Sequence, residues 1–109
     1  MLTVVETPLF QAIWPNYWTE KERGKFCANI GANPEVGDVV ARSGGVRKVR
    51  WSRAGSGKSG GVRVIYFTQT QAGEVVLLII YAKSKLDTLK ASTLKELRNA
   101  VEKSLQTND

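Results

Sequence analysis

The chain has 109 residues, enough for one hydrophobic core but too few for two, so we predict a single domain over residues 1–109. Apolar residues make up 42% and charged residues 24%, which excludes a disordered chain, and the net charge is +6. One cysteine, Cys27, and no histidine exclude an internal disulfide and the usual zinc sites. No segment has the roughly eighteen apolar residues of a membrane span, so we expect a cytoplasmic protein without metal or cofactor.

The N-terminus is predicted to form a short strand followed by a helix. The strand covers residues 3–6 (TVVE). Thr7 is a candidate N-cap, and Pro8 then occupies the first helical position, where a missing N–H costs nothing. The helix is expected to end at Pro15, because the residue before a proline avoids helical geometry.

A second helix is predicted to begin at Thr19. Thr19 and Glu22 have the spacing of a capping box, in which each side chain bonds the other residue's backbone N–H. Gly31 and Pro34 are expected to end this helix. Cys27 lies in its apolar stripe, so we interpret it as a small packing residue rather than a nucleophile.

Three strands are predicted in the second half, at residues 46–51, 62–70 and 74–82. The last two are separated only by QAG, which indicates an antiparallel hairpin. Residues 75–80 are apolar at every position, as in a strand covered on both faces.

A C-terminal helix is predicted from a second capping box, Thr93 to Glu96, and from leucines and valine at helical spacing through Leu105. The fold class is therefore α+β. We expect an antiparallel sheet of four to five strands, with two N-terminal helices and the C-terminal helix packed on it.

Basic residues are concentrated where acidic ones are missing. Between Asp38 and Glu74 there is no acidic residue, whereas seven of the sixteen basic residues lie there. Such a window attracts phosphates in a salt-dependent way. Strand alternation places Lys48 and Arg50 on one face, opposite to Val49. If the hairpin closes, these cations and Arg63 converge at one end of the sheet.

The stretch SRAGSGKSGG (52–61) partly matches a phosphate-binding loop, but Ser52 stands where that motif needs glycine. The segment that follows has the composition of a strand, not of the helix that such loops require. We therefore interpret 52–61 as the flexible tip of a cationic hairpin.

The segments NPEVGDVV, SGGVRKVRWSRAGSGKSGGVRVIYF and LLIIYAKSKLDTL resemble the RelE/ParE toxin superfamily, most closely its HigB-type toxins. The resemblance runs from Asn33 to the last helix. It implies a microbial-ribonuclease-like fold and metal-independent cleavage of mRNA in the ribosomal A site, by the toxin of a type II toxin–antitoxin system. It also implies a HigA-like helix-turn-helix antitoxin, through which alone the complex would bind operator DNA.

Carried over position by position, the resemblance places paired basic residues at Lys48 and Arg50 and a phosphate-stabilising arginine at Arg63. It also places a basic residue, Lys83, directly after the central strand at residues 74–82. The expected catalytic residues are Lys48, Arg50, Arg63 and Lys83. The expected RNA-binding residues are Arg47, Arg53 and Lys58, of which Lys58 belongs to the loop of the HigB-like branch.

In one respect the sequence departs from that family. Many of its ribonucleases carry a tyrosine or histidine near the C-terminal helix, in or near an acid/base role, whereas no aromatic residue or histidine follows Tyr81. The general base is therefore unassigned. Either a lysine acts, with a pKa lowered by neighbouring cations, or the ribosome and the RNA supply part of the chemistry, or catalysis is weak.

Two other functions are compatible with the sequence. One is a ParE-like toxin that poisons gyrase and does no RNA chemistry, although that branch generally lacks the cationic strand pair. The other is a non-catalytic RNA-binding module, with Trp14, Trp18 and Trp51 as stacking platforms, although Trp14 and Trp51 fit apolar faces better.

Overall fold

The computed structural model describes residues 1–51, 61–69, 71–82 and 89–106. Three of the residues expected from sequence to act on RNA lie outside this part of the chain: Arg53, Lys58 and Lys83. The prediction of a flexible hairpin tip at 52–61 also falls outside it, apart from Gly61. Among the described residues, no helix is long and apolar enough to cross a membrane.

The described strands form one five-stranded sheet in the order β1-β5-β4-β3-β2. They are β1 (Thr3–Glu6), β2 (Asp38–Val39), β3 (Arg47–Trp51), β4 (Val62–Gln69) and β5 (Glu74–Ala82). The predicted hairpin is confirmed, because β4 and β5 pair antiparallel. Strand β5, whose residues 75–80 are all apolar, lies between β1 and β4, with both faces covered as expected.

The sheet is mixed rather than entirely antiparallel, because β1 runs parallel to β5. Parallel neighbours need a long crossover, and here the chain between them passes through both N-terminal helices and three other strands. The prediction of an antiparallel sheet was wrong at this edge. A four-residue strand pattern carries no information on the direction of its partner.

The first two helices begin where the sequence predicts. Helix α1 (Pro8–Ile13) is capped by Thr7, whose Oγ1 accepts a 3.2 Å hydrogen bond from the N–H of Phe10. The same Oγ1 donates to the carbonyl of Leu77, which ties the start of α1 to β5. The helix stops before a short 3-10 turn, η1 (Trp14–Asn16).

Helix α2 (Glu20–Ala32) begins with the expected capping box. Glu22 N–H donates to Thr19 Oγ1 at 3.2 Å, and Thr19 N–H donates to Glu22 Oε1 at 2.9 Å. Helix α3 (Ala91–Gln106) begins two residues before the predicted cap at Thr93. Leu94 N–H already donates to the carbonyl of Lys90, so Thr93 lies inside the first turn and its predicted capping role is wrong.

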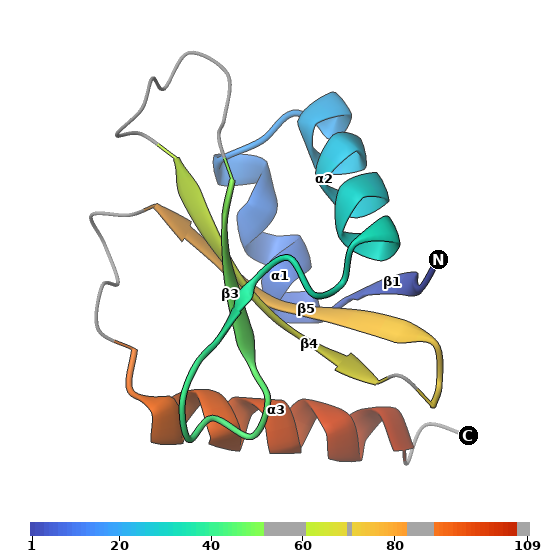
Figure 1. Cartoon of the computed structure of the whole chain (residues 1–109). Coiled ribbons are helices and arrows are strands. Elements are labelled where there is room, and N and C mark those ends of the chain that lie inside the picture. The colour runs from blue at the N-terminus through green and yellow to red at the C-terminus, as the bar shows by residue number, and fades with distance from the viewer. Residues whose placement is uncertain (52–60, 70, 83–88, 107–109) are drawn as a thin grey trace.

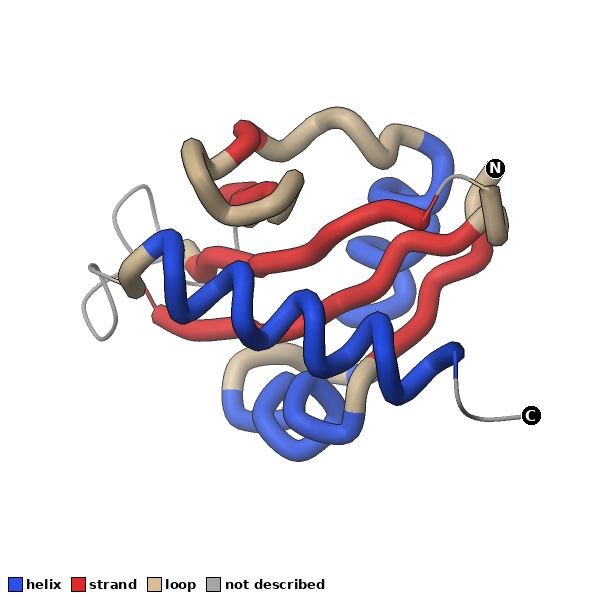
Figure 2. Tube along the Cα trace, turned by 90° about the horizontal axis from the view of Figure 1, so that it is seen from below, coloured by secondary structure: helices blue, strands red, loops and turns tan. Residues whose placement is uncertain are grey.

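The helices cover opposite faces of the sheet. Figure 1 shows α1 and α2 on one side and α3 on the other, and Figure 2 shows α3 running across the strands. We call the first interface the α1/α2 core; its buried residues are Phe10, Trp18, Phe26, Ile30, Val49, Val62, Val64, Tyr66, Val75, Leu77 and Ile80. We call the second the α3 core; its buried residues are Val46, Ile65, Phe67, Val76, Leu78, Tyr81 and Leu94.

One irregularity in β5 controls which side chains reach the α3 core. Tyr66 pairs with Leu77 and Ile65 with Ile79, so Leu78 is an extra residue without a partner in β4. Strict alternation would place Tyr81 on the same face as Leu77, in the α1/α2 core. The bulge reverses the phase, and Tyr81 faces the α3 core instead.

Candidate functional site

Three residues on neighbouring strands form a row across the α3 face of the sheet. Arg50 of β3 is the cross-strand partner of Arg63 of β4, and Arg63 is the partner of Tyr81 of β5. Residues directly opposite each other in a sheet project from the same face. We call Arg50, Arg63 and Tyr81 the arginine–tyrosine row. Lys48 lies two residues along β3 from Arg50, and therefore on the same face.

The cations of this face have no carboxylate partner among the described residues. Lys48 and Arg50 are exposed and Arg63 is half-buried. In the described part of the chain, no carboxylate lies within salt-bridge distance of these three side chains. Asp38 of β2 is the cross-strand neighbour of Lys48, but it is exposed and forms no such pair.

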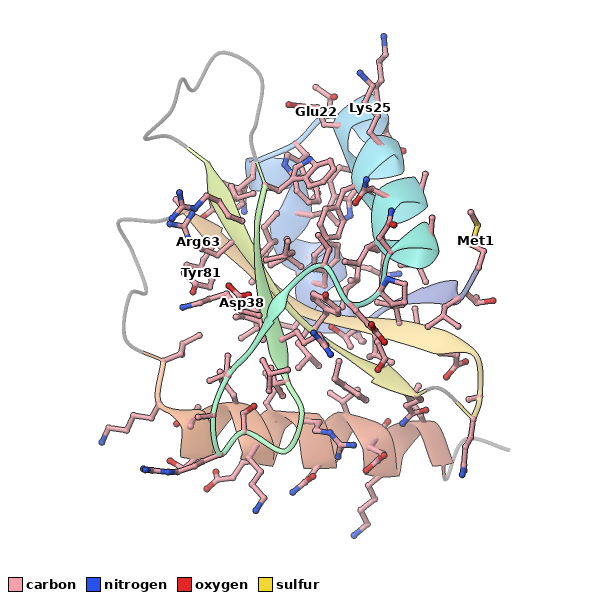
Figure 3. All side chains as sticks on the ribbon, in the orientation of Figure 1. Met1, Glu22, Lys25, Asp38, Arg63 and Tyr81 are labelled. Atoms are coloured by element: carbon pink, nitrogen blue, oxygen red, sulfur yellow. The ribbon has the colours of Figure 1, made fainter. Side chains whose placement is uncertain are left out.

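Two arginines directly opposite each other in a sheet repel, which weakens the pairing of β3 with β4. A bound anion removes this repulsion, and guanidinium groups hold phosphate in a bidentate way. The Arg50–Arg63 pair therefore suits a phosphate that bridges the two strands. Figure 3 shows Arg63 and Tyr81 at the same end of the sheet, where β4 begins and β5 ends.

Of the residues selected from sequence, the structure brings together Lys48, Arg50 and Arg63 on one face. Sequence reasoning did not include Tyr81, because the bulge at Leu78 decides its face. The sequence of β5 gives no signal for this bulge. Its residues are apolar in an unbroken run, so the pattern does not show which side chains face which side of the sheet.

Arg47 faces the other way and supports a loop. Its Nη1 donates to the carbonyl of Gly37 at 2.7 Å and to that of Glu35 at 3.3 Å. Tyr66 holds the same loop, since its hydroxyl accepts from the N–H of Gly37 at 2.9 Å and donates to the carbonyl of Pro34 at 2.8 Å. These contacts place Arg47 in the support of the loop before β2, apart from the arginine–tyrosine row.

We expect Gly37→Ala to destabilise the protein by about 2 kcal/mol, because overpacking a filled site forces neighbours to move. A Cβ at this position would lie 2.8 Å from Tyr66 Oη and 3.1 Å from the carbonyl oxygen of Lys48. Tyr66 is fully buried and cannot move aside. Urea unfolding measures the change. Gly24→Ala is the matched control, since a Cβ there meets nothing within 4 Å; an equal loss in both variants would contradict this account of the clamp.

Cys27 lies on the opposite side of the sheet, half-buried against the α1/α2 core. Burial, together with the nearby carboxylate of Glu6, raises the pKa of its thiol to about 11. The thiol is therefore protonated at neutral pH, as expected for a packing residue.

This raised pKa predicts slow alkylation of Cys27 in the folded protein. At pH 8.5 the thiolate fraction is on the order of 100-fold lower than in an unfolded chain, so iodoacetamide should react more slowly by at least that factor. Because the folded pKa is the higher one, this thiol stabilises the fold fully below about pH 9, and the contribution is lost as pH rises toward 11. Equal reaction rates with and without denaturant would show that the thiol is not held in this way.

The tryptophans take part in packing rather than forming an exposed stacking surface. Trp18 is buried in the α1/α2 core, and Trp14 and Trp51 pack against it. Phe26 contacts both Trp18 and Trp51 through its ring.

A pocket at the end of α2, lined by residues from Asn29 to Val36, lies apart from the arginine–tyrosine row.

A solved structure with a similar fold is that of a mutant of the E. coli toxin RelE in the free state. The two chains are 13% identical and superpose with a TM-score of 0.57, over 95% of this chain and 97% of the other. The likeness extends over the whole α+β fold. Residues 10–109 match the family model described as the RelE toxin of the RelE/RelB toxin–antitoxin system. The chain therefore belongs to the RelE toxin family.

Proposed function

We propose that this protein is a ribosome-dependent, metal-independent endoribonuclease that cleaves mRNA and thereby inhibits translation. The observation that carries the proposal is the Arg50–Arg63 pair, whose charges no described carboxylate neutralises and which lies beside a tyrosine. A phosphodiester between two guanidinium groups is held and polarised for attack by the adjacent ribose 2′-hydroxyl.

Each cation has a distinct part in this proposal. Arg63, half-buried in the middle of the arginine–tyrosine row, holds the scissile phosphate and stabilises the charge that develops on its oxygens. Arg50 and Lys48, which are exposed, bind the same phosphate and its neighbour along the RNA. From the sequence alone we add Lys83 to the catalytic set, and Arg53 and Lys58 to the RNA-binding set.

Ribosome dependence follows from what the site lacks. The sequence has no histidine, the usual general base at neutral pH. The ribosome compensates by holding the mRNA codon in the A site, with the 2′-hydroxyl in line with the phosphate that it attacks.

The family implies an antitoxin partner. We propose that it is a HigA-like protein with a helix-turn-helix domain, and that this toxin reaches operator DNA only through it. A reading frame for such a protein next to that of the toxin would support this assignment.

The experiment that tests the function is induction of the protein in growing cells, followed by simultaneous measurement of mRNA integrity and DNA damage. We expect growth arrest with mRNA fragments that appear before any DNA breaks. DNA damage before mRNA fragmentation would favour a gyrase-directed toxin instead. RNA binding without cleavage, even on translating ribosomes, would favour a non-catalytic module.

A further inference from the structure

The proposed cleavage reaction, on which this inference rests, requires a proton donor as well as cations. When the 2′-oxygen attacks phosphorus, a P–O2′ bond forms and the P–O5′ bond breaks. The departing 5′-oxygen is a poor leaving group unless it is protonated as the bond breaks. Arginine does not release a proton at physiological pH, so neither Arg50 nor Arg63 can supply it.

Tyr81 is in the right place to be this donor. It is the direct cross-strand partner of Arg63, so a phosphate bound by that guanidinium lies next to the tyrosine. Its ring belongs to the α3 core together with Ile65 and Leu78 and is only 5% exposed. Packing of this kind fixes the ring, and a general acid is effective when it is held in place before the substrate binds.

The other described proton donors are less well placed. Tyr66 lies on the opposite face of the sheet, in the α1/α2 core. Asp38 is on the edge strand β2, two strands away from Arg63. Lys48 lies opposite Ile65, two residue pairs further along the sheet than Arg63, and its long side chain is exposed.

We propose that Tyr81 is the general acid of this site and protonates the departing 5′-oxygen. The phenol gives its proton to the 5′-oxygen as the P–O5′ bond breaks, while the 2′-hydroxyl proton is lost to solvent water. The products are a 2′,3′-cyclic phosphate and a 5′-hydroxyl. The phenolate left behind is stabilised by Arg63 and takes a proton from water before the next cycle.

A phenol suits this step at neutral pH because an ordinary tyrosine carries its proton there. The protonated phenol is neutral, so it does not reduce the positive charge of Arg50 and Arg63 before the proton is transferred. The bulge at Leu78 acquires a functional reason in this account, because without it the phenol would face the α1/α2 core.

The test compares Tyr81→Phe with the parent on two versions of a short mRNA bound in the ribosomal A site. One has the natural oxygen at the cleaved bond. The other has sulfur in place of the bridging 5′-oxygen, and a thiolate departs without prior protonation. Tyr17→Phe is the matched control, since Tyr17 packs on the opposite face.

We expect Tyr81→Phe to cleave the oxygen-linked mRNA about 100- to 1,000-fold more slowly than the parent. On the sulfur-linked mRNA its rate should return to within about 10-fold of the parent rate, the protonation step being bypassed. Tyr17→Phe should match the parent on both. Cleavage of the sulfur-linked mRNA also shows that the variant is folded.

Two results would overturn the assignment of Tyr81 while leaving the proposed function intact. One is parent-like cleavage of the oxygen-linked mRNA by Tyr81→Phe. The other is an equal loss on both substrates, which would make Tyr81 a positioning residue. If the parent cleaves neither mRNA, the proposed function itself fails, and the role of Tyr81 fails with it.

Discussion

Replacing Arg63 with alanine is expected to lower the rate of mRNA cleavage by about 1,000-fold and to abolish growth arrest, with the fold intact. The size follows from the loss of a preorganised group that stabilises charge in the transition state. Arg63 occupies the middle of the arginine–tyrosine row, between Arg50 and Tyr81, so no other described side chain replaces it. Arg63→Lys should recover only part of the rate, because an ammonium group cannot hold phosphate in a bidentate way.

The comparison requires a variant with the same charge change elsewhere. Lys95→Ala serves, because Lys95 is an exposed cation on α3. Single-turnover cleavage on ribosomes and thermal unfolding are measured for both. If Arg63→Ala cleaved mRNA and arrested growth as well as the parent, the assignment of the site to this face would be wrong.

Replacing Arg23 with methionine is expected to destabilise the protein by about 3 kcal/mol. Its guanidinium binds Glu6 through two hydrogen bonds, Nε to Oε2 at 2.6 Å and Nη2 to Oε1 at 2.9 Å. It also lies 4.9 Å from the ring of Trp14. The side chain of Glu6 is only 9% exposed, so its carboxylate would be left buried with the weak Cys27 thiol donor, 3.8 Å from Oε2, in place of the guanidinium.

Urea unfolding of two further variants separates this effect from the loss of a surface charge. Glu20→Gln removes an exposed carboxylate that contacts the same guanidinium, and should cost less than about 0.5 kcal/mol. Arg23→Met combined with Glu6→Leu should recover most of the lost stability, because no buried charge remains unpaired. If the double variant were as unstable as Arg23→Met, the loss would have to come from packing around Trp14.

Local chemistry made several parts of the fold predictable from sequence. The caps at Thr7 and Thr19 depend on a side-chain oxygen within three residues of the N–H that it satisfies, so spacing alone reveals them. Alternation in β3 correctly places Lys48 and Val49 on opposite faces of the sheet, because the strand is regular.

Other parts depend on contacts distant in sequence. The parallel direction of β1 is set by pairing with β5, some seventy residues later. The bulge at Leu78 exists only in the register between β4 and β5, and it decides that Tyr81 joins the candidate site. The role of Arg47 in supporting a loop likewise depends on carbonyl groups that the folded chain brings to it.

The most direct test of the account is to map the ends of a defined mRNA after incubation with the protein on programmed ribosomes. The parent should leave a 2′,3′-cyclic phosphate and a 5′-hydroxyl at one bond in the A-site codon, and Arg63→Ala should leave the mRNA intact. An intact mRNA with a parent protein that still arrests growth would contradict the claim that this face of the sheet cleaves RNA.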